Sequence, residues 1–312
     1  MAHDRRFRFG IQLSQPLAGL TWADSARKVE STGYSSLFLP DHFGDQLAPI
    51  PAMMAAADAT TELKVGALVF DNDYKHPVVM AKEIATIDQL SGGRVEFGLG
   101  SGWMRSDYDE SGIPYDPPKV RVERFFEGVQ IIKGLWSDEP VTFEGEHYTI
   151  TAHNGLPKPT TPGGPPLLIG GGAPRMLRFA GAHADIVGVN PSIHSGAIDG
   201  DAARDAAADR FDQKIAWVKE GAGDRFDELE LNVLVFLAQV TDDADGVAEM
   251  MAPLFGSTPD MVKETPAAVF GTVDAICEQL EARRDRWGVS YYVFQGDALD
   301  SMAPVVARLA GN

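Results

Sequence analysis

The hydrophobic and polar positions of this chain alternate between short apolar runs and longer segments with helical spacing. The apolar runs predict eight strands, over residues 7–13, 35–39, 63–70, 95–99, 166–169, 185–189, 229–240 and 289–294. The helical segments follow them in turn, over residues 21–32, 51–60, 78–91, 120–136, 174–184, 204–220, 273–287 and 299–309. Eight strands that alternate with helices are typical of an α/β fold, the (β/α)8 TIM barrel, in which the loops after the strands carry the chemistry.

Two segments depart from this alternation. Residues 138–165, between the fourth helix and the fifth strand, predict an insertion with a hairpin whose turn is Glu144-Gly145-Glu146. Residues 241–271 form an extended segment after the seventh strand. We interpret the first as an insertion and not as a domain, so residues 1–312 are predicted to form one barrel domain.

The stretch from Ser91 to Trp103 contains the fourth strand and the glycines around it. Gly92 and Gly93 end the preceding helix, because glycine readily adopts the left-handed conformation of a helix C-terminus. Three further glycines lie within and after the strand, Gly98, Gly100 and Gly102. They remove side chains where the strand leaves the sheet, which would let a flat or phosphorylated ligand approach the backbone. The same glycines could simply ease the strand into a loop.

Composition and charge exclude several classes of partner. The chain has 312 residues and a formal net charge of −18, which repels the phosphates of nucleic acids and anionic lipid surfaces. It contains no apolar run of membrane-spanning length, and its first residues lack the apolar core of a signal peptide, so a cytoplasmic location is expected. The single cysteine, Cys277, is expected to be a small buried hydrophobe.

In a barrel of this kind, candidate catalytic residues come directly after the strands. Those positions are occupied by Gln12, Ser14, Asp41, His42, Asn72, Tyr74, residues 100–103, residues 170–173, Asn190 and Gln295. They include no glycosidase-like carboxylate pair, no histidine cluster with metal-ligand spacing and no G-x-S-x-G nucleophile motif, so no metal site is expected.

The segment LLIGGGAPR, residues 167–175, indicates a phosphate site. It reads as a strand, three glycines and a helix with Pro174 in its first turn. Free backbone N–H groups and the positive end of a helix dipole would therefore converge on one point. The alternative is that three glycines only make a tight turn between the strand and the helix.

Several motifs, taken together, resemble those of the bacterial luciferase-like flavin and deazaflavin oxidoreductases. They are PDH after the second strand, N-x-Y-x-x-P after the third, LSGGR-V-x-F-G-L-G-S-G-W through the fourth, G-L-W and E-P-V-T-F-E-G-x-x-Y around the insertion, and L-L-I-G-G-G before the fifth helix. The resemblance spans the chain up to about Pro191 and weakens afterwards. It implies a (β/α)8 barrel that performs redox chemistry with FMN or with coenzyme F420, and it favours the F420-dependent branch.

The resemblance also assigns roles to individual residues. Asp41 and His42 match an Asp-His pair near the reactive ring of deazaflavin-dependent members, and a non-proline cis peptide is expected within residues 67–70. The implied cofactor-binding residues are Asp41, Ala67, Leu68, Val69, Asn72, Gly100, Gly102 and Trp103 for the ring or ribityl chain, and Tyr108, Gly170, Gly171, Gly172 and Ala173 for the phosphate. Trp103 could instead be ordinary packing at the rim of the barrel.

The implied reaction is hydride transfer between F420 and a small organic substrate. His42 would take or give the accompanying proton, because imidazoles titrate near neutral pH, although it could also be a hydrogen-bonded loop residue. Asp41 would orient the imidazole or contact the cofactor. One alternative is an FMN-dependent monooxygenase that receives reduced flavin from a reductase and uses oxygen. A more distant one is a flavin-free barrel that binds a phosphorylated metabolite.

Assembly can also be anticipated from the pattern. The helices over 51–60 and 78–91 carry more small and apolar residues than one inward face requires, so part of this surface is expected to be buried between subunits. Luciferase-like proteins pair through this side of the barrel, so the resemblance implies a homodimer. The substrate and the direction of reaction are set by loops without a recognisable motif.

Overall fold

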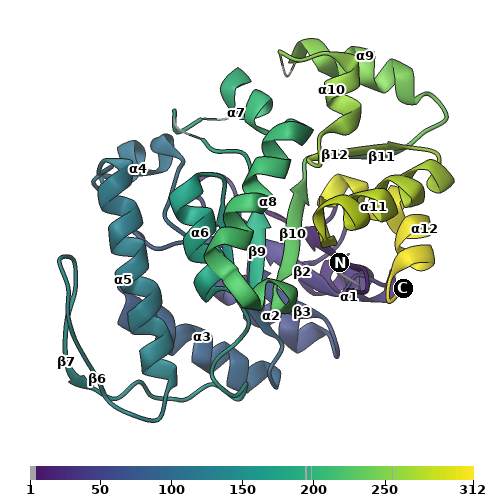
Figure 1. Cartoon of the computed structure of the whole chain (residues 1–312). Helices are drawn as coiled ribbons and strands as arrows, with labels where there is room; N and C mark the ends of the chain where they lie inside the picture. Colours follow the sequence, from purple (N-terminus) through teal and green to yellow (C-terminus); the bar gives the residue numbers. More distant parts are fainter. Residues whose placement is uncertain (1–4, 194, 198, 255) are drawn as a thin grey trace.

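Eight parallel strands form a closed barrel in the part of the chain that the computed structural model describes, residues 5–193, 195–197, 199–254 and 256–312 (Figure 1). The strands are β1 Arg8–Gln12, β2 Ser36–Leu39, β3 Lys64–Ala67, β5 Val95–Gly100, β8 Leu167–Gly171, β9 Ile186–Val189, β10 Glu230–Val235 and β13 Val289–Gln295. They are ordered β3-β2-β1-β13-β10-β9-β8-β5, and pairing of β3 with β5 closes the ring. The predicted TIM barrel is confirmed.

Helices surround the barrel and return the chain from one strand to the next. They are α1 Trp22–Ser31, α2 Pro49–Ala59, α3 Pro77–Ser91, α5 Pro118–Trp136, α6 Pro174–His183, α8 Ala208–Ala222, α11 Val273–Trp287 and α12 Leu299–Leu309. The end signals behave as predicted: the Thr21 side chain caps the first turn of α1, and Gly92 ends α3 in the left-handed conformation with φ of 67°. No helix in the described ranges is both long and apolar enough to cross a bilayer.

The third predicted strand is two strands with a bend between them. Residues 64–67 form β3 and Phe70–Asp71 form the short β4, which pairs with β5. The Leu68–Val69 peptide bond between them is cis. The expected non-proline cis peptide within residues 67–70 is thus confirmed.

The seventh strand was predicted as one continuous element over residues 229–240, and this prediction is wrong because the segment forms two strands. β10 stays in the barrel, whereas β11 Leu237–Val240 leaves it and pairs with β12 Ala268–Gly271. The segment after it is not extended: it contains α9 Ala244–Leu254 and α10 Pro259–Glu264. The alternating apolar pattern continues through the branch point, so the sequence alone did not reveal the change of partner.

The remaining elements are additional to the strands and helices of the barrel. The predicted hairpin is confirmed as β6 Val141–Glu144 and β7 Thr149–His153, and it projects to one side beside α5 (Figure 1). The helix expected over 204–220 divides into α7 Gly200–Asp205 and α8. The short elements are α4 Arg105–Ser111 and the 3-10 helices Gly223–Glu228 and Gly296–Ala298. Figure 1 shows α9 and α10 at the upper right of the view, α7 at its upper centre and α4 at its upper left.

The interior of the barrel is filled in layers. Phe38, Leu168, Ile186, Tyr291 and Val293 pack together in the middle, and none of them is more than 3% exposed. This layer leaves no open channel through the barrel, as is usual for a TIM barrel core.

A polar network lies beneath that layer, at the amino ends of the strands. Arg8 forms ion pairs with Glu96 and Glu230, each at 2.7 Å, and the Tyr291 hydroxyl donates to Glu96 at 2.8 Å. The Arg8 guanidinium also lies 4.0 Å from the centre of the Tyr291 ring. Each buried polar group is therefore partnered, as burial requires. Cys277 is buried on α11, as expected.

Candidate active site

The predicted site residues collect at one face of the barrel because all eight strands are parallel. We call this face, formed by residues 40–42, 68–70, 100–103, 170–173, 190 and 295, the mouth of the barrel. The carboxyl ends of β2, β3, β5 and β8 bring together residues that are far apart in the sequence. In TIM barrel enzymes the active site lies at this face.

The cis peptide forms a bulge across the mouth. The side-chain amide of Gln12 donates to the Leu68 carbonyl at 3.0 Å. The Val69 side chain lies over β5, because a Cβ placed on Gly100 would be 2.7 Å from Val69 Cγ2. Leu68 and Val69 are half-buried, whereas Ala67 is fully buried. Of the three residues expected to touch a cofactor here, only Leu68 and Val69 therefore reach the surface of the mouth.

His42 follows β2 and is held in place from two sides. Its Nδ1 atom is 2.6 Å from Asp107 Oδ2, and its ring meets the Trp103 indole edge-on with centroids 5.5 Å apart. Gln46 donates to the His42 carbonyl at 2.6 Å, which also restrains the backbone. His42 therefore has a defined orientation at the mouth. Trp103 is half-buried and contacts this imidazole.

Asp41 does not orient the imidazole. Its Oδ2 atom accepts a hydrogen bond from the backbone N–H of Asp71 at 3.1 Å, so the carboxylate ties β2 to β4. Burial raises the pKa of Asp41 above its usual value. The suggestion that Asp41 positions His42 is thus corrected, because Asp107 occupies that place. Contact between Asp41 and a cofactor stays a prediction.

Beneath the mouth lies a cluster of buried carboxylates. Burial raises the pKa of Asp71 to about 7, and it also raises the pKa of Asp73. Asp73 forms an ion pair with Arg124 at 2.9 Å. The Tyr108 hydroxyl donates to Asp71 at 2.8 Å. The cluster thus combines buried acids with donors that satisfy them.

Tyr108 was expected to hold the cofactor phosphate, and the structure places it elsewhere. The side chain is fully buried, its hydroxyl is bound to Asp71, and its ring packs against Tyr74 and Tyr115. Gly102 covers it closely, since a Cβ at Gly102 would be only 1.8 Å from the Tyr108 hydroxyl oxygen. In this conformation Tyr108 is a packing residue under the mouth and reaches no ligand.

Asn72 is also directed away from the interior. A Cβ placed on Gly128 of α5 would be 2.3 Å from Asn72 Oδ1, and Asn72 donates from its amide to the Tyr148 hydroxyl at 3.3 Å. The residue is 3% exposed. Its side chain therefore joins β4 to α5 and to the hairpin, and it does not line the mouth as expected.

The turn from β8 to α6 is built as an anion site would be. The N-cap of α6, Ala173, offers no side-chain cap, so the first N–H groups of the helix are left for another acceptor. Close packing also requires glycine at two of the positions before this helix. A Cβ on Gly171 would meet the Met176 side chain at 2.4 Å, and one on Gly172 would meet the Asn190 carbonyl oxygen at 2.5 Å. Gly170 alone has ordinary contact distances, of 3.4 Å or more.

Two residues at the site were missed by the sequence reasoning. Asp107 and Asp71 lie next to His42 and Asp41, yet neither was a candidate. Asp107 belongs to α4, which is separated from the end of β5 by four residues, so a search restricted to strand ends passes over it. The only available signal was a run of acidic and aromatic residues, SDYDE, after the glycines.

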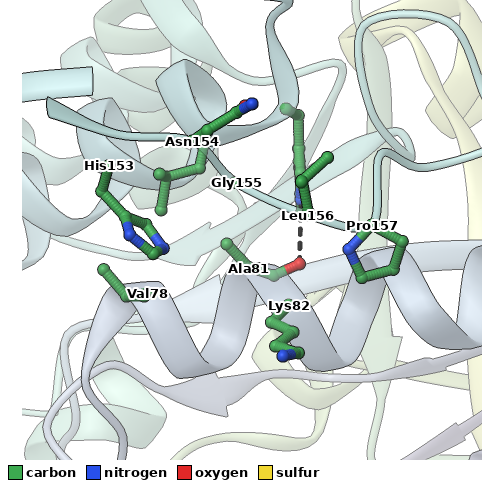
Figure 2. A pocket seen from close by; sticks show the side chains of 10 residues that line it. Val78, Ala81, Lys82, His153, Asn154, Gly155, Leu156 and Pro157 are labelled. Carbon is green, nitrogen blue, oxygen red and sulfur yellow. Dashed lines mark hydrogen bonds between the residues drawn. The ribbon is translucent and has the colours of Figure 1, made fainter. Parts of the chain in front are cut away.

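A cavity lies outside the mouth. It has a volume of about 340 Å³ and is enclosed by α3 and the segment that follows β7, with Val78, Ala81, His153 and Leu156 among its lining residues (Figure 2). None of the predicted site residues lines it. It therefore gives no support to the proposed active site.

One group of possible metal ligands occurs in the described part of the chain, also away from the mouth. Donor atoms of Glu123, Glu146 and His147 lie within 4.8 Å of one another between α5 and the hairpin. Glu123 is already paired with Arg175 at 3.2 Å. This pairing competes with a cation, and the group has no connection to His42.

Comparison with known proteins identifies the family. The Luciferase-like monooxygenase family matches residues 14–290. The chain belongs to the luciferase-like monooxygenase family. Among curated members, an F420-dependent glucose-6-phosphate dehydrogenase from Nakamurella multipartita is 29% identical over 300 residues, covering 91% of this chain and 83% of the relative. By family, this chain is thus a luciferase-like oxidoreductase.

Solved structures with the same fold extend this comparison. An F420-dependent secondary alcohol dehydrogenase, solved with an F420-acetone adduct, superposes with a TM-score of 0.78 at 20% identity, over 98% of this chain and 99% of the other. A coenzyme F420-dependent tetrahydromethanopterin reductase from Methanopyrus kandleri gives 0.76 at 19% identity, over 98% and 100%. At these identities the likeness is one of fold, the luciferase-like barrel.

Proposed function

We propose that this luciferase-like chain is an F420-dependent oxidoreductase that transfers a hydride between F420 and a small organic substrate. The observation that carries the proposal is the placement of His42 at the mouth, beside Trp103 and on the same face as the Leu68–Val69 bulge. The 29% identity to an F420-dependent dehydrogenase over nine-tenths of the chain supports the choice of cofactor.

The residues at the mouth fit such a cofactor. Gly100 and Gly170 leave the carboxyl ends of β5 and β8 without side chains, and the uncapped start of α6 can receive a phosphate. Val69, on the bulge, presents an apolar surface between these two strands. When bound, F420 supplies the carbon that gives or takes the hydride.

The chain itself supplies orientation and a proton site. The Trp103 contact and the Asp107 hydrogen bond hold the His42 ring in one place, so that it can exchange a proton with a bound substrate. The half-buried bulge restricts the side from which a flat ring can approach. A fixed acid or base next to a fixed ring is the arrangement that hydride transfer from an alcohol-type carbon requires.

An FMN-dependent monooxygenase is the second candidate. The family description itself, Luciferase-like monooxygenase, favours it. The same glycines and the same helix start would serve FMN, whose phosphate is also an anion. The two functions therefore differ in the ring that the mouth prefers and in the use of oxygen.

A fluorescence titration with F420 and with FMN tests the proposal. We expect F420 to bind more tightly than FMN and Gly170→Val to weaken F420 binding, because its branched side chain projects from β8 into the mouth. Gly170 is the suitable position, since the neighbouring glycines are already needed for packing. Unchanged thermal unfolding of the variant is the control. Tighter binding of FMN would favour the monooxygenase, and binding of neither would overturn both in favour of a flavin-free barrel.

A further inference from the structure

Three hydrogen-bonding groups converge on the side chain of Asp107. His42 Nδ1 lies 2.6 Å from Oδ2, the Tyr74 hydroxyl donates to the same oxygen at 3.1 Å, and the Phe43 backbone N–H donates to Oδ1 at 3.3 Å. The Asp107 side chain is only 6% exposed. Oδ1 thus accepts from a backbone N–H and Oδ2 from a hydroxyl, so the Asp107 side chain acts as an acceptor in this arrangement.

The partners of Asp107 can only be donors in this arrangement. The backbone N–H of Phe43 always donates. The pKa of Tyr74 is raised far above its usual range, chiefly by burial and then by the carboxylates of Asp71 and Asp107, so its hydroxyl keeps its proton. The remaining contact, at Nδ1 of His42, must then be an N–H directed at Asp107.

We propose that Asp107 is a positioning residue that fixes the tautomer of His42, with the proton on Nδ1 and the lone pair on Nε2. In the described part of the chain, Nε2 of His42 has no hydrogen-bond partner. The two ring nitrogens point in diverging directions, so binding of Nδ1 to Asp107 turns Nε2 away from that carboxylate. The tautomer of a histidine is set by the hydrogen bond that its other nitrogen makes.

This inference rests on the proposed function and specifies it. A neutral His42 held as the Nδ1–H tautomer can accept the proton of a substrate hydroxyl at Nε2, while the carbon that bears this hydroxyl gives its hydride to the proposed F420 and becomes a carbonyl carbon. The opposite tautomer would place an N–H at that position and could not accept the proton. Removing the orienting carboxylate of a histidine base slows catalysis by several orders of magnitude when the wrong tautomer results.

The tautomer can be measured without any cofactor. Nitrogen-15 NMR of histidine-labelled protein, at a pH where the ring is neutral, should show Nδ1 protonated and Nε2 unprotonated for His42. The resonance is assigned by its loss in His42→Gln. In Asp107→Asn the side-chain amide can donate to Nδ1, so the proton should move wholly or partly to Nε2. Asp107→Glu should restore the original pattern.

Kinetics provide the second readout. Asp107→Asn should lower kcat roughly 100-fold or more, with KM and F420 affinity within about threefold. Asp109→Asn is the matched control, because Asp109 is an exposed acid on the same helix and, among the described residues, pairs only with Arg105, at 3.2 Å. It should change neither the NMR pattern nor kcat.

The outcomes separate the two proposals. An unprotonated Nδ1 in the parent protein, or an unchanged tautomer and kcat in Asp107→Asn, would overturn the positioning role. If the parent shows the expected tautomer but binds no F420 and has no turnover with it, the positioning role stands and the proposed function fails. A merely structural role for Asp107 would change stability without moving the proton, and this result would also overturn the inference.

Discussion

Gln12, at the end of β1, donates its side-chain amide to the Leu68 carbonyl, 3.0 Å away, and so holds the bulge between β3 and β4. Gln295, at the end of β13, donates in turn to Gln12 Oε1 at 3.2 Å. Residues at the ends of β1 and β13 therefore hold the backbone that follows β3. Gln12 is 8% exposed, so water cannot easily replace it.

Gln12→Leu should therefore lower the free energy of unfolding by about 1–3 kcal/mol, because it leaves the buried Leu68 carbonyl without its donor. The measurement is urea-induced unfolding of the variant beside the parent. Gln15→Leu is the control: Gln15 bonds only to Asp45 at an exposed site and should cost less than about 0.5 kcal/mol. Equal stability of Gln12→Leu and the parent would show that the bulge needs no such support.

His42→Ala should reduce turnover by roughly 100-fold to 10,000-fold while F420 affinity stays within a few-fold, because a general acid or base is lost and a cofactor ligand is not. Steady-state kinetics with a separate binding titration measures both. His183→Ala, on α6, serves as the control for loss of an imidazole. Loss of F420 binding with normal turnover at saturation would make His42 a cofactor ligand instead.

Gly102→Ala should be more destabilising than Gly112→Ala, although both glycines have nearly the same left-handed φ, 74° and 76°. A Cβ at Gly112 meets nothing within 4 Å, so that variant costs only about 1 kcal/mol for the backbone conformation. At Gly102 the new methyl group would strike the Tyr108 hydroxyl and Asp71, adding about 1–3 kcal/mol.

A Tyr108→Phe background tests this explanation of the excess cost. Phenylalanine lacks the hydroxyl oxygen that the new Cβ would strike, so the penalty of Gly102→Ala should shrink in that background. Chemical denaturation of the four proteins gives the coupling energy. Full additivity would mean that the excess has another origin.

Asp71 should make stability depend on pH in an unusual direction for a carboxylate. Burial raises the pKa of Asp71 to about 7, well above the usual value of an aspartate, so the folded state holds the proton more tightly than the unfolded chain. The contribution is fully present below about pH 4 and is lost as pH rises through 7, by about 4 kcal/mol at most. Asp71→Asn has no such group to ionise.

The stability of Asp71→Asn relative to the parent should thus rise between pH 4 and pH 8. Denaturant unfolding at several pH values measures the difference, and the subtraction cancels the other carboxylates of the cluster. A difference that stays constant over this range would show that Asp71 ionises normally in the folded protein.

We still propose a homodimer, but the residues that support this proposal are different from those that first suggested it. Of the small and apolar residues that suggested it, Met53, Ala56, Ala57, Met80 and Ala81 are buried within the chain itself. Two exposed apolar residues remain on α3, Val79 at 47% and Leu90 at 66%. Val79→Glu should shift the mass found by light scattering toward the monomer, and Leu20→Glu, on another exposed leucine, should not. A monomeric parent at micromolar concentration would refute the dimer.

Local signals predicted those parts of the fold whose structure depends on local interactions. The bounds of α11 follow from the Thr272 cap and the left-handed Gly288, both next to the apolar pattern. The branch after β10 could not be predicted, because Phe236 and its neighbours continue the alternation while the chain changes its partner strand. Which strand a segment joins is decided by contacts distant in sequence.

The sequence predicted those parts of the candidate site that can be located by their position directly after a strand. His42 and the β8–α6 turn were proposed in this way, whereas the bulge was implied by the resemblance to luciferase-like proteins. Asp107 was not predicted, because its role depends on how a short helix folds back over β2, and spacing says nothing about that. The same limit explains Tyr108 and Gly172, which were assigned to a ligand although the contacts that the structure gives them are with other parts of the chain.

The filled interior of the barrel has a kinetic consequence. Arg8, Glu96 and Glu230 occupy its amino end, and Phe38 and Tyr291 leave no passage above them. Any two ligands that react at the mouth must therefore enter and leave from that one side of the barrel. The ligand that binds deeper must arrive first and depart last, so catalysis by this chain should follow a compulsory order and not a random one.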